Sequence, residues 1–216
     1  MKRYLAELIG TFALVFCGTG AIIIDQQTNG GVTHVGIALT FGMIVMSMIY
    51  TFGSISGAHI NPAVTIGFVI LKKMKSKEVL PYLAAQLTGA VMASVFLHGL
   101  FPQNRDLGVT VPSGTNGQSF FLEIILSFFL MLVIIQVSTG SKEQGMFAGL
   151  AVGSVVALEA LFAGPVTGAS MNPARSLGPA IVSGNLSQVW IYILAPLAGV
   201  LLAVMISKFV NTKDPE

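Results

Sequence analysis

The sequence predicts an all-α membrane protein with six transmembrane helices and two half-helices arranged as an inverted repeat. The chain has 54% hydrophobic and only 9% charged residues, whereas an ordinary soluble domain has about 25% charged residues. Six apolar segments are long enough to cross a bilayer, and two more are about half that length. The tripeptide Asn-Pro-Ala opens both short segments, and its copies at Asn61 and Asn172 lie 111 positions apart in 216 residues.

The six predicted spans follow one another with short connections. A hydrocarbon core of about 30 Å needs about 20 residues of helix, because each residue adds about 1.5 Å. The first span follows Lys2 and Arg3, and it ends at Asp25 without the small-residue cleavage pattern of a signal peptide. The spans are predicted at 4–24, 33–53, 80–101, 118–138, 146–165 and 187–209.

Two shorter apolar segments, 62–72 and 173–183, are predicted half-helices. Each is about 15 Å long and reaches no farther than the bilayer midplane. In each motif, Asn is placed to be the N-cap and Pro to be the first helical residue, where its missing N–H costs nothing. The Asn oxygen can accept from the first N–H groups of the helix, which leaves the NH₂ group as a donor beyond the helix end. The motif residues are Asn61, Pro62, Ala63, Asn172, Pro173 and Ala174.

Half-helices that enter from opposite faces bring their N-termini together near the centre of the bilayer. Two donor amides and the positive ends of two helix dipoles then face one point. A small neutral acceptor is bound there, whereas a cation is repelled. A water held through its oxygen by two donors cannot relay a proton. This arrangement predicts a path for water and small neutral molecules.

The basic residues predict the orientation of the chain. Loops on the cytoplasmic side carry an excess of Lys and Arg, and only Arg105 falls in a loop on the opposite side. Both termini are therefore predicted to be cytoplasmic. The residues on the cytoplasmic side are Lys2, Arg3, Lys72, Lys73, Lys75, Lys77, Lys142, Lys208 and Lys213.

The two halves are predicted to be inverted repeats, 1–109 and 110–216, within a single channel domain of residues 1–216. Three spans in each half bring the second half in from the opposite face of the membrane. An acidic residue inside a span also recurs, as Glu7 and Glu123.

The segments before the half-helices cannot be regular helix, although they lie at membrane depth. Non-helical backbone at that depth must line a wet cavity, and its carbonyls can exchange with the hydration shell of a polar solute. His59 is interpreted as a residue that orders its loop by hydrogen bonding, and a pH gate is the alternative. The predicted pore-loop residues are Gly57, Ala58, His59, Gly168, Ser170 and Met171.

Arg175 breaks the symmetry of the two motifs, because Val64 occupies the matching position in the first half. A cation in the first turn of a helix opposes the helix dipole, and a residue that breaks a local rule suggests function. We interpret Arg175 as a donor fork at a constriction and a barrier to cations, with anchoring of the 167–171 loop as a second role.

Other function classes find little support in the sequence. A single cysteine, Cys17, excludes an internal disulfide and a paired-cysteine metal site, and the three histidines lack metal-ligand spacing. We expect no metal, no cofactor, no nucleic-acid partner and no enzymatic activity. An ion-coupled secondary transporter is the alternative, since inverted repeats and broken helices serve both classes. Its coupling site is harder to place, because the midplane groups are neutral asparagines.

The stretches Ser56–Thr65 and Gly168–Ser176 resemble the motifs of the major intrinsic protein family, the aquaporins and glycerol facilitators, and the resemblance covers nearly the whole chain. It implies six tilted helices and two half-helices around one pore per subunit, with subunits assembled as a homotetramer in the lipid bilayer. It also implies a four-residue selectivity filter at Phe41, Ala160, Ala169 and Arg175.

The filter composition implies the range of solutes. Water-selective members have His where this chain has Ala160, so a wider and more apolar constriction is expected to pass glycerol as well as water. A strictly water-selective channel remains the alternative, as does a register in which Glu159 faces the pore. The chain is most similar to bacterial and nodulin-like plant members, which implies a bacterial plasma-membrane protein.

Three acids stand inside predicted spans, where an isolated charge is expensive and a partner is expected. Glu7 and Glu123 are predicted to accept from backbone N–H groups of the loops that precede the half-helices. Glu159 has no evident partner; we expect it to support the 167–171 loop, with a pore-lining or proton-coupling role as the alternative.

Overall fold

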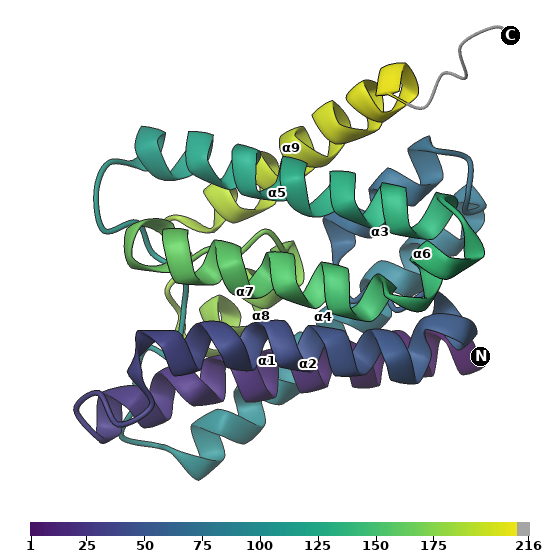
Figure 1. Cartoon of the computed structure of the whole chain (residues 1–216). Coiled ribbons are helices and arrows are strands. Elements are labelled where there is room, and N and C mark those ends of the chain that lie inside the picture. The colour runs from purple at the N-terminus through teal and green to yellow at the C-terminus, as the bar shows by residue number, and fades with distance from the viewer. Residues whose placement is uncertain (211–216) are drawn as a thin grey trace, which may run out of the picture.

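The computed structural model describes residues 1–210, and that part of the chain is helical apart from its loops (Figure 1). Residues 211–216, which include Lys213 and the end of the predicted second repeat, lie outside the described residues. The elements are α1 (Lys2–Gln27), α2 (Thr33–Ser56), α3 (Pro62–Ile70), the 3-10 turn η1 (Ser76–Glu78), α4 (Val79–Leu100), α5 (Asn116–Thr139), α6 (Lys142–Met146), α7 (Ala148–Thr167), α8 (Pro173–Ser183) and α9 (Val189–Val210).

The predicted fold class is confirmed. The helices α1, α2, α4, α5, α7 and α9 are each long and apolar enough to cross a membrane, and the short helices α3 and α8 begin at the two Asn-Pro-Ala motifs. The prediction missed η1 and α6, which are too short to give an apolar span. Helix α6 is instead marked by a capping box in which Ser141 and Gln144 each accept from the other's backbone N–H.

The long helices pack in pairs that recur in the two halves. Helix α1 packs on α4, and α5 packs on α9. Each pair includes a glycine against the backbone of its partner: a Cβ added to Gly89 would overlap the Leu8 carbonyl, and one added to Gly199 would overlap the Ile124 carbonyl. Because lipid gives no hydrophobic drive between helices, this close backbone approach provides the packing energy.

Helices α2 and α7 join the two halves, and they run side by side in Figure 1. A Cβ on Gly42 would lie 2.5 Å from the Gly153 carbonyl oxygen, and a Cβ on Gly153 would lie 2.6 Å from the Gly42 oxygen. These two helices therefore touch backbone to backbone at Gly42 and Gly153.

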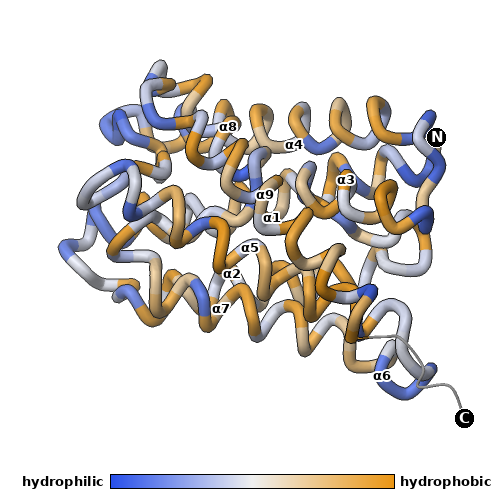
Figure 2. The backbone as a smooth tube through the Cα atoms, turned by 90° about the horizontal axis from the view of Figure 1, so that it is seen from above, coloured by the Kyte–Doolittle hydropathy of each residue, from blue (hydrophilic) through white to orange (hydrophobic). Residues whose placement is uncertain are grey.

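The outer surface of the bundle is apolar. Large side chains such as Phe129, Phe162 and Leu202 are exposed along the long helices, and the hydrophilic stretches gather at the loops and helix ends (Figure 2). A surface of this kind is matched to lipid. This surface agrees with the prediction of an integral membrane protein.

Candidate functional site: a pore between the half-helices

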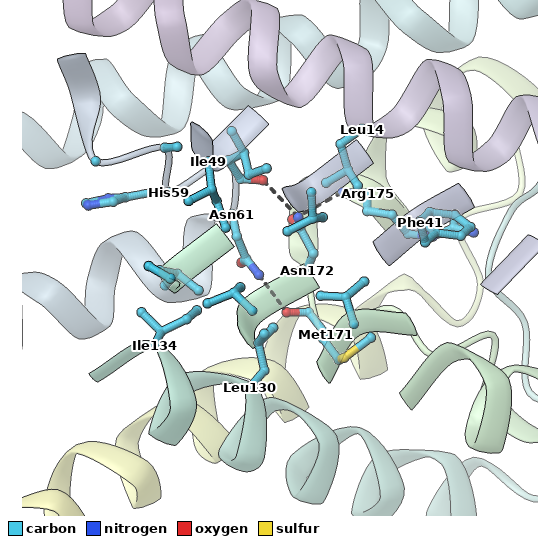
Figure 3. Close-up of a pocket in the computed structure, with 18 of the residues that line it drawn as sticks. Leu14, Phe41, Ile49, His59, Asn61, Leu130, Ile134, Met171, Asn172 and Arg175 are labelled. Carbon is cyan, nitrogen blue, oxygen red and sulfur yellow. Dashed lines mark hydrogen bonds between the residues drawn. The ribbon is translucent and has the colours of Figure 1, made fainter. Parts of the chain in front are cut away.

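Asn61 and Asn172 hold the tips of the two half-helices against each other. The Asn61 oxygen accepts from the backbone N–H of Ala63 at 2.9 Å, and the Asn172 oxygen accepts from that of Ala174 at 3.0 Å, so both are N-caps as predicted. The Asn61 amide nitrogen donates to the Met171 carbonyl, and the Asn172 amide nitrogen donates to the Ile60 carbonyl, both at 2.8 Å (Figure 3).

This crosswise bonding corrects one expectation. The sequence suggested that both hydrogens of each amide would be free, whereas one of the two is used between the loops. Each NH₂ group carries two hydrogens, so one donor per asparagine remains. Both asparagines line the same cavity, so their remaining donors lie beside it.

The backbone of the two pore loops is strained in matching places. In the first loop φ is +46° at Ala58 and +42° at Ile60, and in the second it is +42° at Ala169 and +53° at Met171. Positive φ is rare outside glycine, and rarer still for a β-branched residue such as Ile60. Each such residue costs on the order of 1–3 kcal/mol and persists only where its surroundings hold it.

Glu7 anchors the backbone of the first pore loop. Its carboxylate accepts from the backbone N–H groups of His59 at 2.9 Å and Ile60 at 2.7 Å. The Ser56 hydroxyl and the Gln86 amide donate to the same carboxylate at 2.7 Å and 2.8 Å. Glu7 is fully buried, and these four donors satisfy a group that would otherwise be costly at this depth.

Glu123 holds the second loop in the same way. It accepts from the backbone N–H groups of Ser170 and Met171, both at 2.8 Å, and from the Thr167 hydroxyl. The structure thus pairs each repeat-related acid with the loop that precedes a half-helix, as the sequence predicted.

Glu159 does not share this arrangement. Its side chain is 8% exposed, and its buried Oε2 atom has no hydrogen-bond partner within residues 1–210. The expected support of the 167–171 loop is not seen, because Glu123 occupies the donors of that loop. Glu159 is also absent from the residues that line the cavity.

A cavity runs past the two asparagines, with a polar side and an apolar side. The polar side is built from the pore loops and Arg175, and the apolar side comes from the long helices. Sequence reasoning missed the apolar side, whose residues carry no motif; their only signal is position on the inner face of a span. They include Leu14, Val45, Leu130, Ile134, Val152 and Val156.

The predicted pore-loop residues divide into two groups. Gly57, Ala58, His59, Ser170 and Met171 line the cavity. Gly168 does not; it ends α7 in a left-handed conformation, with its N–H donating to the Gly164 carbonyl at 2.9 Å.

His59 is held by several contacts, including a tilted contact with the Tyr82 ring at a centroid distance of 5.2 Å. Its Nδ1 atom lies 3.1 Å from the Thr65 hydroxyl, its ring stacks on Phe68 with the centroids 4.6 Å apart, and its backbone N–H donates to Glu7. These contacts order the first pore loop.

The four predicted filter residues all line the cavity: Phe41 from α2, Ala160 from α7, Ala169 from the second loop and Arg175 from α8. The Arg175 guanidinium carbon lies 5.0 Å from the centre of the Phe41 ring, within the range of a cation–π contact.

Arg175 is anchored differently from the expectation. Its Nη1 donates to the Gly108 carbonyl at 2.8 Å, in the loop between α4 and α5, and not to the 167–171 loop. The hydroxyl of Ser176 in α8 instead joins α8 to both the second pore loop and the loop between α4 and α5. Thr110 donates to Ser176 at 2.7 Å, and Ser176 lies 2.6 Å from Ser170.

Two tyrosines that the sequence reading overlooked fix the ends of the helices before the pore loops. Tyr82 donates to the Ser56 carbonyl at 2.8 Å, and Tyr192 donates to the Thr167 carbonyl at 2.6 Å. Both hydroxyls satisfy a carbonyl at a helix C-terminus, where no intrahelical partner exists. Their separation nearly equals that of the asparagines, and this repeat could have identified them.

The comparisons with known proteins decide the family. The family model described as major intrinsic protein matches residues 1–207. The chain belongs to the major intrinsic protein family. Nodulin-26 of Glycine max is 43% identical over 215 residues, which cover 99% of this chain and 79% of that protein. Aquaporin NIP1-2 of Oryza sativa subsp. japonica is 47% identical over 203 residues, which cover 90% of this chain and 67% of the relative.

A solved structure gives the same result for the fold. The aquaglyceroporin from Plasmodium falciparum matches with a TM-score of 0.87 and 26% identity, over 98% of this chain and 96% of that one. As a member of the major intrinsic protein family, this chain is an integral membrane channel and not an enzyme, as predicted. The two relatives named above are plant proteins, so they give no support to the expected bacterial source.

Proposed function

We propose that this chain is a passive channel that conducts water and small uncharged solutes such as glycerol, and that it excludes protons and ions. The observation that carries the proposal is the pair of crosswise asparagines at the tips of two half-helices, each with one N–H left over beside a cavity. A water that accepts from both remaining donors has its oxygen fixed and cannot pass a proton along the file.

The electrostatics of the half-helices support the exclusion of cations. The N-termini of α3 and α8 present the positive ends of two dipoles to the same part of the cavity. Arg175, whose side chain is only 2% exposed, adds a full positive charge on the cavity wall. Among residues 1–210, none of the side chains that line the cavity is acidic, so they offer a cation no opposite charge.

Selection by size falls to Phe41, Ala160, Ala169 and Arg175. Ala160 leaves the α7 side of the filter small and apolar, while Arg175 offers donors to a hydroxyl group. A solute with both an apolar carbon face and hydroxyl groups matches such a wall, and glycerol is a solute of that kind.

The wider assembly is part of the proposal. The chain acts as one domain built from inverted repeats, 1–109 and 110–216, and forms a homotetramer with a pore in each subunit. Both termini face the cytoplasm, because the basic loops lie on that side. A bacterial plasma membrane stays a prediction based on the sequence alone.

Stopped-flow light scattering on proteoliposomes tests the function. Osmotic water flux, glycerol flux and urea flux are measured in parallel with empty liposomes, and a proton-sensitive dye reports leakage. We expect water and glycerol fluxes well above the lipid background, with no proton flux. Solute flux that followed an imposed Na⁺ or proton gradient would indicate a coupled transporter, and water flux without glycerol flux would overturn the proposed solute range.

A further inference from the structure

One backbone carbonyl in α7 lacks its usual partner close to the filter. In a regular helix the N–H of residue 165 donates to the carbonyl of residue 161. Residue 165 is Pro165, inside α7, and proline has no N–H to give. The Leu161 carbonyl therefore needs a donor from elsewhere, since a carbonyl without a partner is costly at membrane depth.

His34 supplies that donor from α2. Its Nε2 atom lies 2.7 Å from the Leu161 carbonyl oxygen, and because the partner is a carbonyl, Nε2 must carry the hydrogen. The imidazole ring lies on the bare surface of Gly164, where an added Cβ would stand 2.9 Å from the His34 Cε1 atom. Three features of two helices thus fit one another: a missing N–H, a missing side chain and a ring nitrogen.

The start of α2 is held so that His34 keeps this position. The Asp25 carboxylate at the end of α1 accepts from the backbone N–H groups of Val32 at 3.1 Å and Thr33 at 2.7 Å. The Thr33 hydroxyl accepts from the Gly36 N–H at 3.2 Å. The first turn of α2 is therefore bonded to α1, and these bonds fix the backbone position of His34.

The contact lies close to two filter residues. Ala160 directly precedes Leu161 in α7, and Phe41 lies two helical turns beyond His34 in α2. Deeper in the bundle the same helices touch at Gly42 and Gly153. The His34 bond is thus a second point of attachment between the helices that carry Phe41 and Ala160.

We propose that His34 is a positioning residue that sets the width of the filter, by holding α7 against α2 through the Leu161 carbonyl. This proposal rests on the channel function proposed above. Without the bond, the two helices separate more readily at the filter. Glycerol, whose passage is limited by width, then gains more than water.

The test compares glycerol and water fluxes of four proteins in proteoliposomes: the natural chain, His34→Ala, His34→Gln and His34→Phe. Glutamine keeps a donor of similar reach, whereas phenylalanine keeps the ring on Gly164 and loses the donor. We expect the glycerol-to-water ratio to rise about fivefold in the Ala and Phe variants, the factor that corresponds to one ordinary hydrogen bond. The Gln variant is expected to keep the natural ratio.

Pro165→Ala gives a direct check of the mechanism. The new N–H of residue 165 can donate to Leu161, so His34→Ala in that background should leave the ratio unchanged. An equal effect of His34→Ala in both backgrounds, or a natural ratio in His34→Phe, would overturn the proposal. Water flux by the natural chain above that of empty liposomes tests the channel itself, so the two proposals fail separately; if the natural chain excludes glycerol, its appearance in His34→Ala counts as the rise.

Discussion

Asn61 and Asn172 are joined crosswise, because each donates to the carbonyl of the residue that directly precedes the other, at 2.8 Å in both cases. The bonds connect loops from the two halves of the chain where the N-termini of α3 and α8 meet. They also fix the direction of the remaining N–H of each amide. The same pair of side chains thus holds the halves together and presents the donors of the pore.

Asn172→Asp should damage both roles. The new oxygen faces the Ile60 carbonyl, so a hydrogen bond becomes a repulsive contact, and a negative charge replaces a donor beside the cavity. We expect water flux to fall at least about tenfold, since an unmet buried group costs about 1–3 kcal/mol, and a cation leak to appear. Stopped-flow measurements and a potassium-sensitive dye check both effects. A variant with normal water flux and no leak would show that the amide donor is dispensable.

Glu123→Gln should loosen the second pore loop. Glutamine brings its NH₂ group toward donors that now bond to a carboxylate, namely the N–H groups of Ser170 and Met171. Hydrogen bonds to charged groups contribute about 1.5–3 kcal/mol each, so we expect a clear drop in the thermal unfolding temperature in detergent. Glu143→Gln, on the exposed helix α6, is the matched control and should leave that temperature unchanged.

Ala160→His should narrow the filter. An imidazole adds bulk and a donor to the α7 side of the cavity wall, which disfavours glycerol while water still fits. We expect glycerol flux to fall at least about tenfold with water flux retained. A tenfold fall corresponds to a barrier to glycerol passage that is higher by about 1.4 kcal/mol. Ala160→Val is the control for bulk without a donor, and stopped-flow light scattering measures both. Unchanged glycerol flux in the His variant would mean that residue 160 does not limit passage.

Gly18→Ala should narrow the same filter by displacing the Phe41 ring. A Cβ at Gly18 would overlap the ring of Phe41, and the open side of that ring is the cavity. The ring must therefore move inward, and glycerol flux should fall more than water flux. Gly20→Ala, two residues further along α1, is the control, because its Cβ would make only an ordinary contact at 3.4 Å with Leu97. Equal fluxes in both variants would contradict this role of Gly18.

The sequence predicted those parts of the fold that depend on local patterns. Apolar length located the six spans, and Asn-Pro at the start of each short segment located the half-helices to within a few residues. The repeat also paired Glu7 with Glu123, although they lie 116 and not 111 positions apart, and the structure places both acids against the pore loops.

Contacts between segments far apart in the chain could not be predicted in this way. A periodic pattern says which face of a helix is buried, but not which atom meets it. The bond from His34 to Leu161 spans 127 positions, and only half of it has a local signal, the proline that removes a donor. The Arg175 bond to Gly108 likewise depends on a loop whose path has no motif.

Glu159→Met should stabilise the protein. Within the part of the chain that the structure describes, the Glu159 Oε2 atom is buried without a hydrogen-bond partner, and such an unmet polar group costs about 1–3 kcal/mol. Methionine has a similar length and no polar group to bury, so the unfolding temperature in detergent should rise. Because Ala160 and not Glu159 lines the cavity, the glycerol-to-water ratio should stay the same. A lower unfolding temperature would reveal a structural partner for this acid, and an altered ratio would reveal a role in the pore.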